Sequence, residues 1–160
     1  MDTPFFLINV DAKIGSKVTA TRLQKVLGEI IHFNQNAYVK GRTILDAVRT
    51  IDDISEYTER ISGLLVAIDF QKAFDSINRS FMIKALSALN FGPSLIHWIQ
   101  TFYKNITSTV MNNGYTTTPF QLLRGVRQGD PLSPYLVIIC LEILAIDIRR
   151  NKDQKFKELW

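Results

Sequence analysis

Two short segments hold the residues of this chain whose types and spacing fit chemistry at a metal ion or a phosphate. The first, LLVAIDFQKAFD at 64–75, is an apolar run that ends abruptly at Asp69. Such a run predicts a strand that is buried along its length and presents one carboxylate at its tip, and Mg²⁺ prefers oxygen ligands of this kind. The second, GVRQGDPLSP at 125–134, is a Gly- and Pro-rich turn that carries Arg127, Gln128 and Asp130 and precedes a long apolar run.

Asp69 has a second interpretation that the residues alone leave open. An aspartate at the end of a strand also starts turns or caps the next helix. Asp75 does not complete a two-carboxylate site with it, because six positions on a helix correspond to a rotation of about 600°, so the two side chains would face different sides. If Asp69 binds a metal, its other ligands must come from elsewhere in the fold.

The turn at 125–134 offers several polar groups to a ligand. Its glycines allow the backbone to approach a ligand closely, and the Gln128 amide provides both a donor and an acceptor. Arg127 is suited to pair with a phosphate or a carboxylate. Asp130 and Pro131 are expected to start the helix that follows. A Gly/Pro turn before a helix is common, so the turn gains weight only from its position after the first segment.

The elements that must position these residues follow from periodicity and turn signals. Helical spacing predicts helices over 16–31, with Ser16 as N-cap, and over 42–60, with a buried apolar face. A strand is expected at 64–69, a helix at 78–90 capped by Asp75 or Ser76 and ended by Gly92, and another helix after Pro93. Asn113-Gly114 predicts a hairpin within 108–125, and Ser133-Pro134 opens a last helix. The order is that of an α+β fold with a thin sheet.

Composition narrows the class of protein further. The 160 residues are 46% hydrophobic and 21% charged, with a formal net charge of +4, which permits a polyanionic partner without requiring one. The single cysteine, Cys140, excludes a disulfide framework and favours a reducing intracellular setting, nuclear or cytoplasmic. The N-terminus has no signal-peptide pattern, and the apolar run at 135–148 is too short and too interrupted to span a membrane. The oligomeric state stays open.

The two segments together resemble a known family. The run Asp69-Phe70-Gln71-Lys72-Ala73-Phe74-Asp75, followed by Arg124 to Pro134, is similar to the reverse transcriptase domain of LINE-type non-LTR retrotransposons. The similarity extends from about Leu7 to about Lys152. It implies right-hand polymerase fingers over 1–62 and a palm over 63–152, with an incomplete palm sheet and flanking helices, and leaves 153–160 as a divergent tail. A group II intron or retron-type reverse transcriptase is the alternative within the same class.

The resemblance implies a function and a set of site residues. The activity is RNA-directed DNA polymerisation, with an RNA template, a DNA primer and dNTPs as partners and two Mg²⁺ ions that assist transfer to the primer 3′-hydroxyl. Asp69 would bridge the metals, with the backbone carbonyl of Phe70 as a further ligand. Phe74 would lie under the nucleotide sugar, unless it is simply a core aromatic. The other implied nucleotide contacts are Arg127, Gln128, Gly129, Lys13 and Arg22.

Departures from the family pattern bear on activity. Thr3-Pro4-Phe5-Phe6 stands where the family usually has Arg-Pro-Ile-Ser, and the Asp-Asp hairpin that follows the last helix in the family is not found. We therefore expect a fragment that gives no primer extension by itself on poly(rA)/oligo(dT) with dTTP and Mg²⁺. A non-catalytic nucleic-acid-binding remnant is the alternative from another class, and it would show steeply salt-dependent RNA binding.

Overall fold

The computed structural model describes residues 10–58 and 66–151. Six helices and four short strands follow one another in these ranges. In chain order they are α1 Val10–Ile30, α2 Ile44–Thr58, α3 Ala73–Ser76, α4 Arg79–Ala88, α5 Pro93–Tyr103, β1 Thr107–Ser108, β2 Met111–Asn112, β3 Tyr115–Thr116, β4 Phe120–Gln121 and α6 Ser133–Arg150. The mixed α and β content agrees with the predicted α+β class, and the strands form two small antiparallel pairs.

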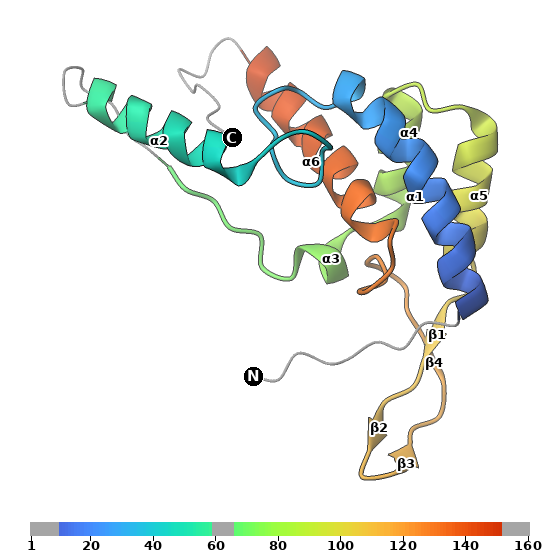
Figure 1. Cartoon of the computed structure of the whole chain (residues 1–160). Helices are drawn as coiled ribbons and strands as arrows, with labels where there is room; N and C mark the ends of the chain where they lie inside the picture. Colours follow the sequence, from blue (N-terminus) through green and yellow to red (C-terminus); the bar gives the residue numbers. More distant parts are fainter. Residues whose placement is uncertain (1–9, 59–65, 152–160) are drawn as a thin grey trace.

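Four helices enclose the hydrophobic core. α6 packs against α1 and α4, and α5 packs against α1 and α4 as well (Figure 1). The apolar stripe of α1 supplies Leu23 and Leu27, and α6 is buried over most of its length because it lies inside the bundle. The largest side chains that are fully buried come from every one of these helices: Leu23, Leu27, Met82, Leu86, Ile99, Leu136 and Ile139.

α4 forms where the sequence predicts it, but the residues at both of its ends differ from the prediction. The N-cap of α4 is Asn78, whose Oδ1 accepts from the backbone N–H groups of Ser80 (2.9 Å) and Phe81 (3.2 Å). The prediction of Asp75 or Ser76 as cap is wrong, because the short helix α3 takes up both residues. α4 ends at Ala88, four residues before Gly92, because Asn90 adopts a left-handed conformation (φ 60°) that closes the helix. The prediction that Gly92 ends this helix is therefore wrong.

The start of α5 and the hairpin confirm their predictions. Gly92 is the N-cap of α5 and Pro93 is its first residue. β2 pairs with β3 through a two-residue turn in which Asn113 (φ 48°) and Gly114 (φ 81°) both have positive φ, as the hairpin turn requires. β1 pairs with β4 at the base, and the hairpin projects away from the helices (Figure 1).

The predicted buried strand is wrong for the residues that the structure describes. Residues 66–69 form no strand and are exposed, while 64 and 65 lie outside the described residues. The predicted buried face of α2 is exposed too, with Ile44 at 69% and Leu45 at 62%, and α2 contacts none of the other described helices or strands. Both predictions rest on periodicity, which identifies an apolar face or an extended run. The backbone of a strand also needs a partner strand, and none of the described residues supplies one.

The first helix starts earlier than predicted, and the loop after it is held to the end of the helix by a side chain. α1 begins before Ser16, so this residue is buried inside the helix and is not its N-cap. At the other end, the Arg42 guanidinium donates hydrogen bonds to the carbonyls of Gly28, Ile31, His32 and Gln35. Arg42 therefore satisfies carbonyls that the end of α1 leaves without helical partners.

The last helix begins at Ser133 and Pro134, as one of the two predictions for its start has it. The other prediction, that Asp130 and Pro131 start the helix, is wrong: both residues precede it in the turn, where Asp130 accepts from the backbone N–H of Leu132. Of the helices within 10–58 and 66–151, none combines the length and the apolar character that crossing a bilayer demands.

Candidate functional site

The two segments that the sequence singles out lie against each other in the structure. The backbone N–H of Val126 donates to the carbonyl of Phe74 (2.7 Å), and the N–H of Gly125 donates to the carbonyl of Ile77 (2.8 Å). α3, which contains Phe74, also packs against α6. Residues about fifty positions apart therefore form one local structure, in which the turn at 125–130 rests on the start of α3.

Gly125 explains how closely the two backbones approach. Its φ is +80°, which disfavours any residue with a side chain, and a Cβ at this position would lie 2.9 Å from the Asp75 carbonyl oxygen. Gly129 also has a positive φ, of +76°, but a Cβ there would meet no atom within 4 Å. The close approach that we predicted for the glycines of this turn is thus made at Gly125, and it is made to the chain's own backbone.

A side-chain contact completes the junction. The Gln128 amide nitrogen donates to both carboxylate oxygens of Asp75, at 3.0 and 3.2 Å. Asp75 is exposed and Gln128 is half-buried, so the pair lies at the surface of the junction. Asp75 therefore serves as a hydrogen-bond acceptor here, and it orients the Gln128 side chain. The Gln128 carbonyl oxygen remains available as an acceptor.

A buried polar network fixes the turn from beneath. Asp130 is only 4% exposed. Its Oδ1 accepts from the backbone N–H of Leu132 (3.0 Å), and its Oδ2 lies 3.1 Å from the hydroxyl of Ser16 on α1. Ser133 donates its hydroxyl hydrogen to the Arg127 carbonyl and lies 3.3 Å from the Tyr103 hydroxyl. The turn is therefore held by groups from α1, α5 and α6.

Two arginines surround the buried Tyr103 ring. The Arg127 guanidinium carbon lies 5.8 Å from the ring centroid and that of Arg79 lies 5.5 Å from it, distances at which a cation is attracted by the ring face. Arg127 also donates to the Phe102 carbonyl (2.7 Å). Burial lowers the pKa of Arg79, an effect that Tyr103 opposes and Arg127 reinforces. Burial also raises the pKa of Tyr103. The phosphate or carboxylate partner predicted for Arg127 is replaced here by a carbonyl and a ring.

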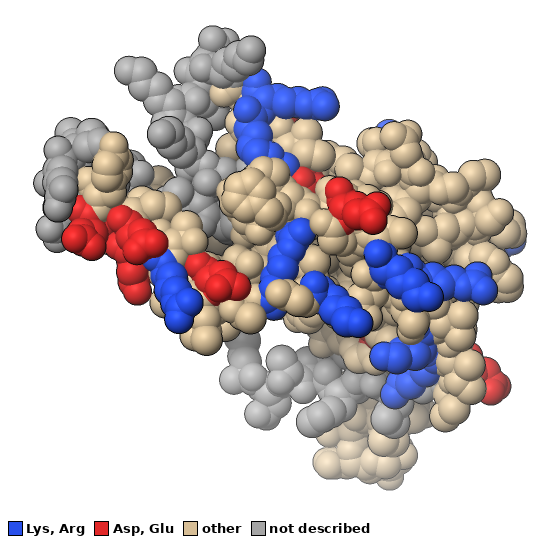
Figure 2. All heavy atoms as spheres, turned by 45° about the horizontal axis from the view of Figure 1, so that its top comes forward, with Lys and Arg blue, Asp and Glu red and all other residues tan. Residues whose placement is uncertain are grey.

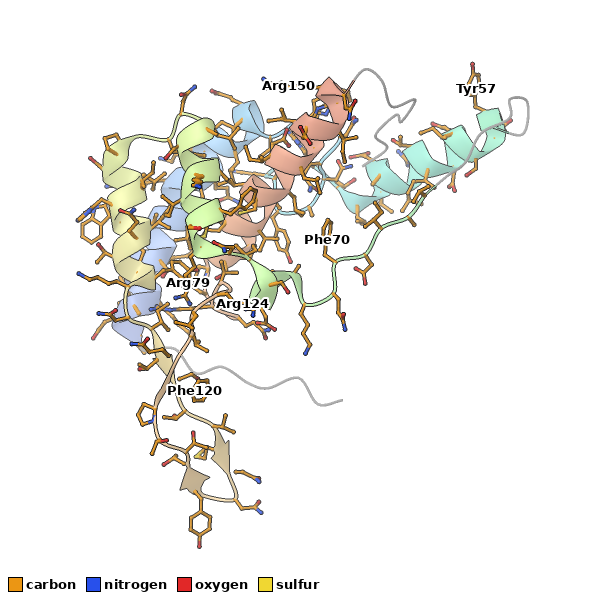
Figure 3. The ribbon with its side chains drawn as sticks, turned by 180° about the vertical axis from the view of Figure 1, so that it is seen from behind. Tyr57, Phe70, Arg79, Phe120, Arg124 and Arg150 are labelled. Carbon is orange, nitrogen blue, oxygen red and sulfur yellow. The ribbon has the colours of Figure 1, made fainter. Side chains whose placement is uncertain are left out.

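Asp69 stands apart from this network. It is exposed, and its carboxylate has no hydrogen-bond or ion-pair partner among the residues that the structure describes. Its neighbours Ile68 and Phe70 line a hollow of about 200 Å³ beside α6, together with His32 and Glu142. Figure 3 shows Phe70 on the segment that leads to α3, apart from Arg79 and Arg124 at the base of the hairpin. The Asp69 oxygens are thus open to a ligand from solvent, while the Phe70 ring faces the helices.

Phe74 is half-buried and packs against the hydrophobic core. This contact matches the core interpretation of the residue, and its contact with a nucleotide sugar stays a prediction. Lys13 and Arg22 are both exposed on α1. They are nine positions apart, a rotation of about 900°, so they lie on opposite sides of the helix and do not form a single site. Figure 2 shows basic side chains over the face that α1 forms and acidic ones gathered on α2.

Sequence reasoning missed the groups that hold the site. Ser16, Arg79 and Tyr103 carry the turn, yet each lies on a helix as an ordinary polar or aromatic residue. No spacing links them to the turn, because their contacts cross between elements. A signal was present only for Gly125, whose place in a Gly-rich turn predicts an unusual backbone.

The donor set for a metal ion is small in the described part of the chain. Within residues 10–58 and 66–151, no group of three or more His, Cys, Asp or Glu side chains is placed to hold an ion. Asp69 offers one carboxylate with free oxygens. A single protein carboxylate is compatible with Mg²⁺, which usually binds to one or two protein carboxylates and completes its coordination shell with water and substrate phosphates.

The chain is similar to one protein family and to several known proteins. The family described as "Reverse transcriptase (RNA-dependent DNA polymerase)" matches residues 4–157. The chain is 38% identical over 150 residues to the transposon TX1 uncharacterized 149 kDa protein of Xenopus laevis, which covers 92% of this chain and 12% of that protein. It is 27% identical over 149 residues to a retrovirus-related Pol polyprotein from a type-1 retrotransposable element R2 of Popillia japonica, covering 91% of this chain and 21% of that protein.

A further relative is the corresponding polyprotein from the type-2 element R2DM of Drosophila melanogaster, 31% identical over 83 residues, which is 52% of this chain and 8% of that protein. These relatives are proteins of non-LTR retrotransposons, the type that the sequence predicts. The chain spans only a small part of their own length.

Proposed function

This chain belongs to the reverse transcriptase family, and on that premise we propose that it forms fingers-like (1–62) and palm-like (63–152) parts of an RNA-directed DNA polymerase from a non-LTR retrotransposon. Members of the family bind a nucleic-acid template, a primer and deoxynucleotides. In the proposal, RNA is the template and a DNA 3′-hydroxyl is the acceptor. Residues 153–160 are assigned no role in it.

One observation carries the proposal: the segment 69–75 and the turn 125–130 are joined in space. The Asp75–Gln128 hydrogen bonds and the Phe74–Val126 backbone bond fix the two together. The segment brings a free carboxylate close in sequence to this junction, and the turn brings an amide and a guanidinium. A nucleotide needs both kinds of group, because its phosphates take a metal ion and its base and sugar take hydrogen bonds.

Within this proposal Asp69 and the backbone carbonyl of Phe70 hold Mg²⁺. When bound, the metal supplies charge stabilisation at the transferring phosphate and lowers the pKa of the attacking hydroxyl. What the chain itself contributes is a carboxylate that has no partner among residues 10–58 and 66–151, so no ion pair with them has to break before it coordinates. Its exposure lets the ion arrive together with the nucleotide.

The nucleotide then lies between Asp69 and the turn. The part of the Phe74 side chain that the core leaves exposed is proposed to face the sugar, where a ring would exclude a 2′-hydroxyl. Gln128, oriented by Asp75, presents its carbonyl oxygen, and the open space at Gly129 admits the ligand to the backbone. Arg127 contributes positive charge from beneath, and Lys13 and Arg22 are assigned to separate contacts on either side of α1.

Primer extension tests the proposal in a polypeptide that carries this chain together with the rest of a reverse transcriptase domain. On poly(rA)/oligo(dT) with dTTP and Mg²⁺, the Asp69→Asn variant should lose about a thousandfold in rate, since a catalytic metal contributes several kcal/mol to the transition state. The matched control is Asp52→Asn on α2, which should keep its rate. Product formation that Asp69→Asn leaves unchanged would refute the assignment.

A further inference from the structure

One third of the chain is free of acidic residues. Residues 76–129 contain none of the 15 Asp and Glu residues of the chain, and they contain five of its 19 Lys and Arg residues: Arg79, Lys84, Lys104, Arg124 and Arg127. This stretch forms α4, α5 and the hairpin. The positive charge on these elements is therefore not offset by carboxylates of their own, and the acidic residues of the chain all lie before 76 or after 129 in the sequence.

A groove between α4 and α5 concentrates part of this charge. It has a volume of about 440 Å³, within the range of sites that hold small ligands. Arg79, His97 and Lys104 lie along it, and none of the residues that line it is acidic. Gln100 and Thr101 add an amide and a hydroxyl. No residue of the segment 69–75 or the turn 125–130 lines it, so the groove is separate from the site proposed for the nucleotide.

The two cations of the groove, Arg79 and Lys104, differ in how firmly hydrogen bonds hold them. Arg79 is fixed, because its guanidinium donates to the carbonyls of Tyr103 (3.3 Å), Arg124 (3.3 Å) and Gly125 (3.2 Å). Figure 3 shows Arg79 and Arg124 together where the hairpin meets the helices. Lys104 and His97 are exposed, and within the described part of the chain their side chains make no hydrogen bond or ion pair. One held cation, a second cation that is exposed and the His97 ring beside them suit a ligand that carries several negative charges along a line.

We infer that the groove between α4 and α5 binds the phosphodiester backbone of a nucleic-acid strand, at a place separate from the polymerase site. The ligand chemistry follows from the lining: positive charge and neutral donors favour phosphates, and no carboxylate opposes them. Ile83, a half-buried apolar residue in the lining of the groove, is suited to the sugar of the same strand. The inference does not depend on Asp69, on a metal ion or on catalysis.

Fluorescence anisotropy with the whole chain and a labelled 20-nucleotide RNA tests it. Lys104→Gln and His97→Gln change exposed residues and should leave the fold intact. If Lys104 makes one phosphate contact, its loss should weaken binding about five- to tenfold at 50 mM salt and reduce the slope of log K against log salt by about 0.7. Lys17→Gln and Lys25→Gln on α1 are the matched controls, and each should change the affinity for the RNA by less than about twofold.

The outcomes separate the alternatives. If the α1 controls weaken RNA binding as much as Lys104→Gln does, the attraction is diffuse and the inference is overturned. The inference is also overturned if none of the variants changes RNA binding. DNA of the same sequence, the duplex and inorganic phosphate as competitor show which source of phosphate the groove prefers. Primer extension plays no part in the readout, so failure here and failure of the polymerase assignment are distinguishable.

A second measurement locates the ligand. Thr101→Cys places a thiol on the groove wall, and the nucleic acid should slow its alkylation by iodoacetamide severalfold. Thr21→Cys on α1 is the control and should be alkylated at the same rate with and without ligand. The native Cys140 does not interfere, because it is buried and burial raises the pKa of its thiol to about 12. Equal protection of both introduced thiols, or of neither, would contradict the inference.

Discussion

The hydroxyl of Ser16 lies 3.1 Å from Oδ2 of Asp130, and both residues are buried. The two are 114 positions apart, and their contact joins the first helix to the turn that carries Arg127 and Gln128. The Ser16 hydroxyl is also 2.9 Å from the Ala12 carbonyl of its own helix. A buried carboxylate is costly unless its oxygens accept hydrogen bonds, so this contact couples the position of α1 to the stability of the site.

We predict that Ser16→Ala destabilises the chain by about 1–3 kcal/mol, because it leaves one oxygen of a buried carboxylate without its donor. Thr21→Ala is the matched control: Thr21 makes the same kind of bond to its own helix, to the Lys17 carbonyl, but is exposed. It should cost less than about 0.5 kcal/mol. Urea unfolding measures both. Equal losses in the two variants would show that Asp130 does not need Ser16.

The two glycines of the turn give a matched pair of a different kind. Both have positive φ, so Gly129→Ala should cost about 1–2 kcal/mol for backbone strain alone. Gly125→Ala adds a Cβ that meets the Asp75 carbonyl, which should cost about 1–3 kcal/mol more. The difference in unfolding free energy between the variants isolates the close approach of the two segments. A difference near zero would mean that the turn does not rest on α3 as described.

Tyr103 should make stability depend on pH in alkaline solution. Burial raises the pKa of its phenol above the ordinary value of about 10. The folded state thus holds this proton more tightly than the unfolded state, so its contribution is complete below about pH 10 and is lost as the pH rises through the folded-state pKa. Tyr103→Phe should flatten the fall in unfolding free energy above about pH 10. Tyr57→Phe, which changes an exposed tyrosine, should leave the slope as it is, and an identical slope in both variants would contradict the prediction.

Arg42 should contribute more to the stability of the chain than is usual for a residue in a loop. It donates to four carbonyls, one in the last turn of α1 and three in the segment that follows the helix. Arg42→Gln should cost about 2 kcal/mol because most of these bonds are lost. Hydrogen exchange should then speed up in the last turn of α1 and in the loop after it. The control Arg22→Gln lies on the same helix with an exposed side chain and should leave exchange there unchanged. If both variants exchange alike, Arg42 is not the cap.

The parts of the fold that were predictable are those decided by local chemistry. Asn113-Gly114 determines the hairpin turn because both residues tolerate positive φ, and Pro93 begins a helix because its missing N–H costs nothing there. Contacts within a single element need no knowledge of the rest of the chain. No local signal indicates the junction of 69–75 with 125–130; the family resemblance alone points to it, because it assigns residues of both segments to one nucleotide site.

The parts that failed depend on partners distant in sequence. A continuous apolar run such as 66–68 becomes a strand only when another strand accepts its hydrogen bonds. The apolar face of α2 predicts burial, but periodicity does not identify what covers it. Ser16 shows the same limit: a serine before a helical stripe is the usual N-cap signal, and its true role was visible only once Asp130 was placed beside it.

Manganese-induced broadening of NMR signals tests the central claim most directly, that Asp69 holds a divalent ion beside the turn at 125–130. Low Mn²⁺ added to the whole chain should broaden the amide signals of 69–75 and of 126–130, and Asp69→Asn should abolish both effects. Asp53→Asn, on the acidic helix α2, should leave them unchanged. Broadening that persists in Asp69→Asn, or that reaches α2 and spares the turn, would contradict the account.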